Sequence, residues 1–325
     1  MAGEIQVNSV TALTESGSNI VLNNVDTATN RTNLGLGSMA TQNANSVALT
    51  GGSITGTTIV PTSPFSFRNR IINGNLSNPI NQRGAASITA STGYTYDRWY
   101  YDGTSLYQGI EDKNVNDGTY VISWQGSGFN AYWKLSTDTT ANNGPDSTGG
   151  FSSALSSGDT FTVSGSGTGN HLWIKFSLDT AVDFSTLDKV MVEEGTVATP
   201  FEHRPYGTEL ALCQRHYATS IPQGYTILNF PTGADGAHMI AVGTNDLFGY
   251  IPFPVEMRAR PTTYIYSSLN RTAGSIRRVT DGSDIAVSSY QPGTSNNKSL
   301  VYFNGVSGVS ANQQFTFHYV AISEL

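Results

Sequence analysis

The first 64 residues lack the large side chains that a small domain normally buries. They contain no Phe, Tyr, Trp, His or Cys, and only four charged residues: Glu4, Glu15, Asp26 and Arg31. One such segment buries too little apolar surface to offset the entropy lost when its backbone is ordered. The regular run SVALTGGSITGTTIV at 46–60 favours β packing between copies of the chain over disorder. We therefore expect residues 1–64 to fold by association with other copies.

The composition of the whole chain excludes several classes of protein. Its 325 residues carry a net charge of −7, which argues against binding to nucleic acid or to an anionic membrane. No apolar run approaches the roughly 20 residues that a membrane span needs. The only cysteine, Cys213, excludes an intrachain disulfide framework, and the start MAGEIQVNSV is acidic and polar, unlike a signal peptide. These features predict a protein made and assembled in a cytoplasm.

The remainder of the chain is predicted to be mainly β. A Pro-containing linker, PTSPF at 61–65, marks a boundary, and all four tryptophans fall between 65 and 206. Short runs rich in β-branched and aromatic residues predict strands there and in 207–325: TYVISW, AYWKLS, DTFTVSGS, LWIKFSL, YTILNF, MIAVG, TTYIYSS, IRRVT, SLVYFNG and QQFTFHYVAISEL. Short strands separated by turn residues are typical of a sandwich or a barrel.

Four stretches resemble the phage tail-fibre and receptor-binding proteins. They are NRTNLGLGSMATQNANSVALTGGSITGTTI, FRNRIINGNLSNPINQRG, YTYDRWYYDG and VMVEEGTVATPFEHRPYGTELALCQRHY. The resemblance implies a slender trimeric stem at 1–64, a jelly-roll β-sandwich similar to carbohydrate-binding modules at 65–206, and a distal β domain at 207–325. The stem would attach the protein to the tail or baseplate.

The function implied by this resemblance is attachment of a virion to its host. We expect a homotrimer that binds a surface polysaccharide or lipopolysaccharide, with recognition rather than catalysis as its activity. Two alternatives stay open: a purely structural baseplate or tail connector, and a depolymerase tailspike that cuts its receptor. No phosphate-binding loop, HExxH or paired CxxC occurs, so we expect no cofactor and no metal.

The densest group of reactive side chains lies at 192–217, where two pairs are candidates for catalysis. Glu193 and Glu194 are adjacent, and neighbours on a strand point to opposite faces, so a shared glycosidase cleft is disfavoured. Cys213 and His216 lie three apart on a predicted helix, TELALCQRHY, with Thr208 as its cap. We expect burial of Cys213 as a small apolar group rather than a nucleophile with a base.

The rest of this window is predicted to join two domains. Pro200 and Pro205 stiffen the path of the chain, and the residues between them can form ion pairs or contacts between copies of the chain. The residues assigned to this joint or trimer contact are Glu202, His203, Arg204 and Pro205.

Candidate glycan-binding residues are aromatic, because sugars present an apolar face of C–H groups ringed by hydroxyls. Two aromatic patches have polar neighbours. The candidates are Tyr100, Tyr101, Trp124, Tyr132 and Trp133 in the first, and Tyr264, Tyr266 and Tyr290 in the second. Large rings are more often buried than exposed, so burial is the competing interpretation for each of them.

Overall fold

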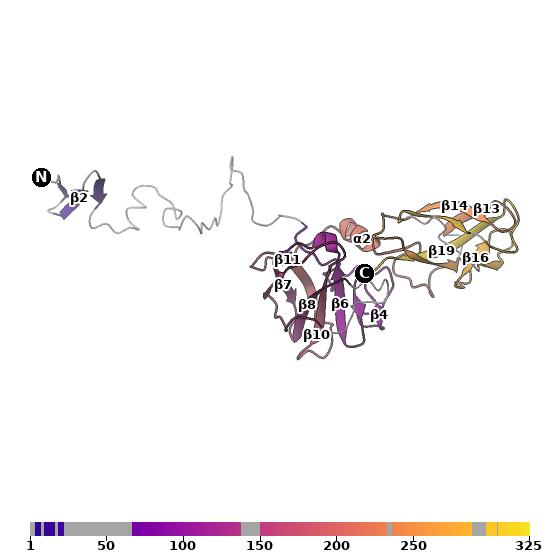
Figure 1. The fold of residues 1–325 in the computed structure, drawn as a ribbon, viewed down its shortest axis with the longest axis horizontal. Helices are drawn as coiled ribbons and strands as arrows, with labels where there is room; N and C mark the ends of the chain where they lie inside the picture. Colours follow the sequence, from indigo (N-terminus) through magenta and orange to yellow (C-terminus); the bar gives the residue numbers. More distant parts are fainter. Residues whose placement is uncertain are drawn as a thin grey trace. The chain divides into compact units, whose positions relative to one another are not determined.

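A computed structural model describes residues 4–7, 10–16, 19–22, 67–137, 150–232, 236–287, 297–303 and 305–325 of the chain. The chain divides into two units, Met1–Val60 and Pro61–Leu325. The described residues are mainly β, as predicted, and their sheets are antiparallel (Figure 1). In the first unit, one small sheet has the order β1-β2-β3. Its strands are Glu4–Val7, Val10–Ser16 and Asn19–Leu22. The rest of the predicted stem lies outside the described residues.

The described residues of 67–206 form two sheets. The larger has the order β4-β5-β6-β10-β8, and the smaller has the order β11-β7-β9. The strands are β4 Gly93–Tyr94, β5 Tyr100–Tyr101, β6 Ser105–Ile110, β7 Gly118–Gln125, β8 Phe129–Ser136, β9 Thr160–Val163, β10 His171–Leu178 and β11 Asp188–Glu194. A short 3-10 helix, η2, covers Asp112–Asn114. The strands predicted from TYVISW, AYWKLS, DTFTVSGS and LWIKFSL correspond to β7, β8, β9 and β10.

Both sheets contribute to one hydrophobic core, as in a β-sandwich. Phe176 from the larger sheet and Ile122 and Val192 from the smaller one are fully buried in it. Trp99 is also fully buried, and its indole N–H donates to the carbonyl of Asn73. Side chains alternate along β10 and β8, so every second residue enters this core and the others lie on the opposite face of the sheet.

The described residues of 217–325 form one larger sheet around the long strand β19. Its central path is β17-β16-β19-β13-β14-β18, and β12 and β15 also pair with β19. The strands are β12 Tyr217–Thr219, β13 Ala237–Ala241, β14 Leu247–Pro252, β15 Thr262–Ser267, β16 Ser275–Arg278, β17 Asp284–Ala286, β18 Ser299–Phe303 and β19 Gln314–Ile322. Phe315, Phe317 and Tyr319 of β19 enter a second core. The opposite face of β19 is covered near Val320 by Phe230.

One predicted strand is wrong. Residues 225–230, YTILNF, form turns instead: Tyr225 N–H donates to the Pro222 carbonyl and Asn229 N–H to that of Thr226. Part of the segment covers β19: Phe230 is buried and packs on His318, with ring centroids 4.4 Å apart. An apolar run that covers a sheet has the same composition as a strand within one.

The helix predicted before Tyr217 is confirmed as α2, Tyr206–Gln214, but its cap is not Thr208. Pro205 precedes the first turn, and no side chain caps it. Proline suits the start of a helix because its φ is already fixed near the helical value. Glu209, in the first turn, accepts hydrogen bonds from Arg204 at 3.0 and 2.9 Å.

Candidate functional site

The aromatic residues predicted for glycan binding in 65–206 lie on both faces of the larger sheet, apart from Trp124, which lies on β7 of the smaller sheet. Trp124 is only 9% exposed and contacts Phe176 edge-on, with ring centroids 5.2 Å apart. Tyr101 and Trp133 pack against the same core, and Trp133 stacks on Phe161 at 5.1 Å. These three candidates therefore contribute mainly to the stability of the sandwich.

Tyr100 and Tyr132 lie on the outer face of that sheet. Tyr100 contacts Tyr94 edge-on at 5.2 Å, and Lys175 lies over the ring of Tyr132 at 5.0 Å. Strands β6 and β10 separate β5, which carries Tyr100, from β8, which carries Tyr132. At about 4.8 Å between neighbouring strands, the two rings are roughly 14 Å apart and do not share one sugar-sized site.

Tyr264 and Tyr266 of the second patch line a groove. It has a volume of about 340 Å³, and its walls are Arg83, Tyr94, Tyr217, Thr226, Ile227, Tyr264, Tyr266, Val320 and Ile322. Tyr264 is 42% exposed. Tyr290, the third candidate of this patch, lies outside the described residues.

The strand register explains how the groove forms. Tyr264 of β15 pairs with Val320 of β19, and Tyr217 of β12 pairs with Ile322 on the other edge of β19. Directly paired residues project from the same face of a sheet. The three strands therefore present tyrosines on both sides of an aliphatic floor, which is suited to the C–H face of a sugar ring.

Arg83 closes one side of the groove and is held rigidly. Its guanidinium lies over the Tyr217 ring at 3.8 Å and over the Tyr94 ring at 5.2 Å. It also donates to Glu324 at 2.7 Å. The Tyr94 hydroxyl donates to the Leu325 carbonyl at 3.0 Å. The groove therefore combines side chains from the sandwich and from the C-terminal sheet, and it rests on buried ionic contacts.

The buried ionic cluster beneath the groove connects these two parts of the chain. Glu324 is fully buried and pairs with Arg98 as well as with Arg83. Burial alone would raise the pKa of Glu324, but the positive charges of Arg98 and Arg83 hold it below its usual value. Asp97 also lies here, 3.6 Å from Arg83, and burial raises its pKa to about 6 although Arg83 opposes this. The cluster explains the charged residues of YDRW and AISEL as structural groups.

His216 and Cys213 are both buried next to this cluster. His216 Nε2 lies 3.2 Å from Glu111 Oε1, and burial together with the charge of Arg98 lowers the pKa of His216 to about 4. Burial raises the pKa of the Cys213 thiol well above its usual value. A buried thiol with a raised pKa carries little thiolate. Both side chains are thus placed as core residues.

The adjacent carboxylates Glu193 and Glu194 have separate partners. Glu193 is buried, and its oxygens accept hydrogen bonds from the Thr199 hydroxyl at 2.9 and 2.8 Å. Glu194 pairs with Arg70 at 2.7 Å. The strand therefore directs the two carboxylates to different surroundings, as the alternation of side chains on β11 predicts.

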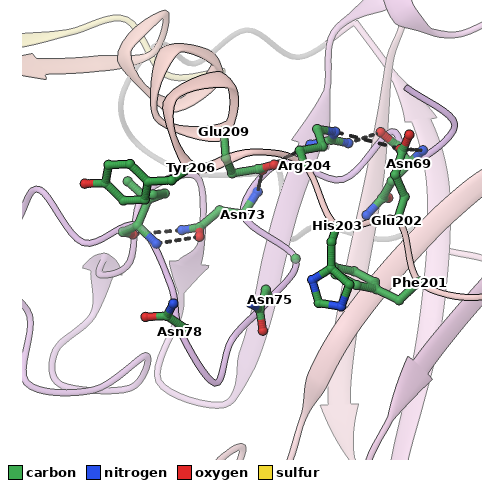
Figure 2. Close-up of a pocket in the computed structure, with 12 residues that line it drawn as sticks. Asn69, Asn73, Asn75, Asn78, Phe201, Glu202, His203, Arg204, Tyr206 and Glu209 are labelled. Atoms are coloured by element: carbon green, nitrogen blue, oxygen red, sulfur yellow. Dashed lines mark hydrogen bonds and ion pairs between the residues drawn. The ribbon is translucent and has the colours of Figure 1, made fainter. Parts of the chain in front are cut away.

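A second, more polar pocket lies beside the segment that precedes α2 (Figure 2). Its volume is about 250 Å³, and its walls are Asn69, Asn73, Gly74, Asn75, Asn78, Ile80, Phe201, Glu202, His203, Arg204, Tyr206 and Glu209. These residues come from two motifs far apart in the sequence, FRNRIINGNLSNPI and TPFEHRPYGTE.

The residues predicted to form the joint lie in or beside this pocket. Arg204 donates to the carbonyls of Asn69 and Ile71 and forms an ion pair with Glu209. Glu202 accepts the Asn69 N–H at 2.9 Å. His203 is exposed, and its ring meets that of Phe201 edge-on at 4.9 Å. Pro205 is exposed at the start of α2.

The sequence alone did not single out several residues that line the two pockets. Arg83, Tyr94 and Tyr217 of the groove lie at separate positions in three different motifs. The composition of those motifs, with an arginine beside glycine in NQRG and tyrosines elsewhere, gives no separate indication of a groove. The same holds for Asn75 and Asn78, since asparagines in NGNLSN are typical of turns and give no separate indication of a site.

No family model matches this chain, and no curated protein shows significant similarity to it. Among the described residues, no helix combines the length and apolar character that crossing a membrane requires. Within those same residues, no three His, Cys, Asp or Glu side chains gather as a metal ion would need.

Proposed function

We propose that this chain is a phage tail-fibre or receptor-binding protein that attaches a virion to a host surface glycan. The resemblance of four sequence stretches supports the class of protein. The groove lined by Tyr264, Tyr266, Tyr94 and Tyr217 beside Arg83 carries the proposed activity. In this proposal residues 1–64 attach the protein to the tail or baseplate and hold three copies together. The protein then acts in the virion by recognition, without a cofactor.

Trimerisation increases the strength of this attachment. A shallow groove with tyrosine walls forms few direct contacts, so each site is expected to bind weakly. Three sites joined in one assembly bind a repetitive polysaccharide together, which raises the overall affinity by a factor of about 10²–10⁴. The trimer would therefore adhere firmly to a polysaccharide while each groove still exchanges its sugar quickly.

Competition with phage adsorption tests the proposal. Purified full-length protein should compete with virions for host cells and slow their adsorption, because both occupy the same glycan. The Tyr264→Ala protein should compete poorly. Tyr250→Ala is the matched control, since Tyr250 is a 67% exposed tyrosine on β14 that is not part of the groove.

The outcomes separate the proposal from its two alternatives. Unchanged adsorption in the presence of excess protein would favour a structural connector. A fall in the chain length of host polysaccharide after incubation with the protein would favour a depolymerase. Slower adsorption with intact polysaccharide is the result that the proposal predicts.

A further inference from the structure

The pocket in Figure 2 has rigid walls. Asn73 N–H donates to Glu209, and the Asn73 side-chain amide donates to the carbonyls of Ile80 and Asp97 at 2.8 and 2.9 Å. Ile80 N–H donates back to the Asn73 side chain at 2.7 Å. Arg204, with a side chain only 6% exposed, ties the opposite wall to the same turn. Such walls keep their shape without a ligand, which lowers the entropic cost of binding.

Polar groups at the mouth of the pocket have no partner within the described part of the chain. No hydrogen bond joins the side-chain amide of Asn78 or the imidazole of His203 to another described residue, and the Asn75 amide nitrogen donates to none. An amide offers both a donor and an acceptor, and an imidazole adds ring nitrogens. Together they match the hydroxyl groups of a polyol.

Charge and size restrict the ligand further. Arg204 is paired with Glu209, and Glu202 adds a carboxylate at the same wall, so an anionic ligand is disfavoured. The pocket volume of about 250 Å³ is below the roughly 300–1,000 Å³ of sites for drug-sized molecules. One sugar ring suits that space.

The rings around the pocket provide apolar contacts for such a ligand. In Figure 2, Tyr206 lies on one side of the pocket and the edge-on pair of Phe201 and His203 on the other, with Asn75 and Asn78 between them. Tyr206 is held by a hydrogen bond from its hydroxyl to Gln223 at 2.6 Å. C–H groups of a pyranose can contact these rings while its hydroxyls reach the amides.

We propose that this pocket is a second ligand site, which binds one neutral pyranose ring through Asn75, Asn78 and His203. It shares no residue with the tyrosine groove. A protein with both sites holds two sugar units of a surface polysaccharide, or two different glycans, in each copy of the chain.

Saturation-transfer NMR on the full-length protein tests this site. The probes are the methyl glycosides of glucose, galactose and N-acetylglucosamine at millimolar concentration. At least one should receive saturation from the wild-type protein. Asn78→Ala and His203→Ala should each weaken binding of that probe roughly five- to tenfold, as expected for one lost hydrogen bond.

The matched control is Gln125→Ala, which removes an exposed amide on β7 outside both sites. It should bind the probe like the wild type. Both pocket residues are exposed, and an unchanged melting temperature for each variant shows that the fold is retained.

Two results would overturn the second site. One is the absence of saturation transfer to all three probes. The other is a signal that persists in Asn78→Ala and His203→Ala but disappears in Tyr264→Ala. In that case the groove is the only sugar site of the two, and the proposed function stands without the second one.

Discussion

At the residue scale, three buried ionisable groups near Glu324 respond to pH in opposing directions. His216 has its pKa lowered to about 4 by burial and by Arg98. Burial would raise the pKa of Glu111, but His216 and Arg215 beside it lower that pKa to about 2. Asp97 has its pKa raised to about 6 by burial. Each shift makes the free energy of unfolding depend on pH.

The signs of these dependences follow from proton uptake. Unfolding lets His216 take up a proton below about pH 6.5, so acidification from 6.5 to 4 removes stability. For Asp97 the folded state binds the proton more tightly, so acidification from pH 6 to about 3.8 restores stability. The two contributions nearly cancel between pH 6 and 4. Loss of the Glu111 contribution follows as the pH falls from 4.5 to 2.

Asp97→Asn should expose this cancellation. Without the carboxyl, the His216 contribution is no longer offset, and between pH 6 and 4 the free energy of unfolding should fall by about 3 kcal/mol more than in the wild type. Denaturant titrations of the full-length protein across this pH range measure the slope. Asp246→Asn, in the loop between β13 and β14, serves as the control. Parallel pH profiles for Asp97→Asn and the wild type would contradict the assignment.

At the element scale, the segment before α2 is held by one arginine. Arg204 donates to both carboxylate oxygens of Glu209 and to two carbonyls of the 69–71 segment. Lysine is a point charge and cannot reproduce this fork of donors. The position of α2 relative to the sandwich therefore depends on the shape of the guanidinium group as well as on its charge.

Arg204→Lys should destabilise the protein by about 1–3 kcal/mol, because buried carbonyls lose their donors. Thermal unfolding of the full-length protein measures the change. Arg70→Lys is the matched control, since the Arg70–Glu194 pair at 2.7 Å is joined through one guanidinium nitrogen and is partly exposed. Equal melting temperatures for the two variants would show that the fork of Arg204 has no special role.

The sequence predicted strands correctly where β-branched and aromatic residues run without interruption. It failed where the composition of a segment does not match its place in the fold. β7, β10 and β19 follow from runs of β-branched and aromatic residues. The turn segment 225–230 has the same composition but covers a sheet, and β14, LFGYIP, contains a glycine and ends in proline. For the groove, Tyr264 and Tyr266 were predicted as aromatic residues with polar neighbours. Arg83 and Tyr217 were not, because only the pairing of β12 and β15 with β19 brings them together.

At the scale of the whole molecule, residues 1–64 are expected to attach the protein to the virion. This proposal rests on their lack of large side chains, which leaves little apolar surface to stabilise the segment without partners. Deletion of residues 1–64 should abolish or strongly reduce incorporation into virions. Quantitative immunoblotting of purified particles measures this. Normal incorporation of the truncated protein would show that residues 1–64 do not anchor it to the virion.

The tyrosine groove is proposed to bind the host glycan, and the most direct test is an affinity measured on purified host polysaccharide. Biolayer interferometry with full-length protein should show that Tyr264→Ala weakens each site by about 1–2 kcal/mol, or roughly five- to thirtyfold. Tyr250→Ala should bind like the wild type. Equal affinities for Tyr264→Ala and the wild type, or no binding of the wild type to the polysaccharide, would contradict the claim.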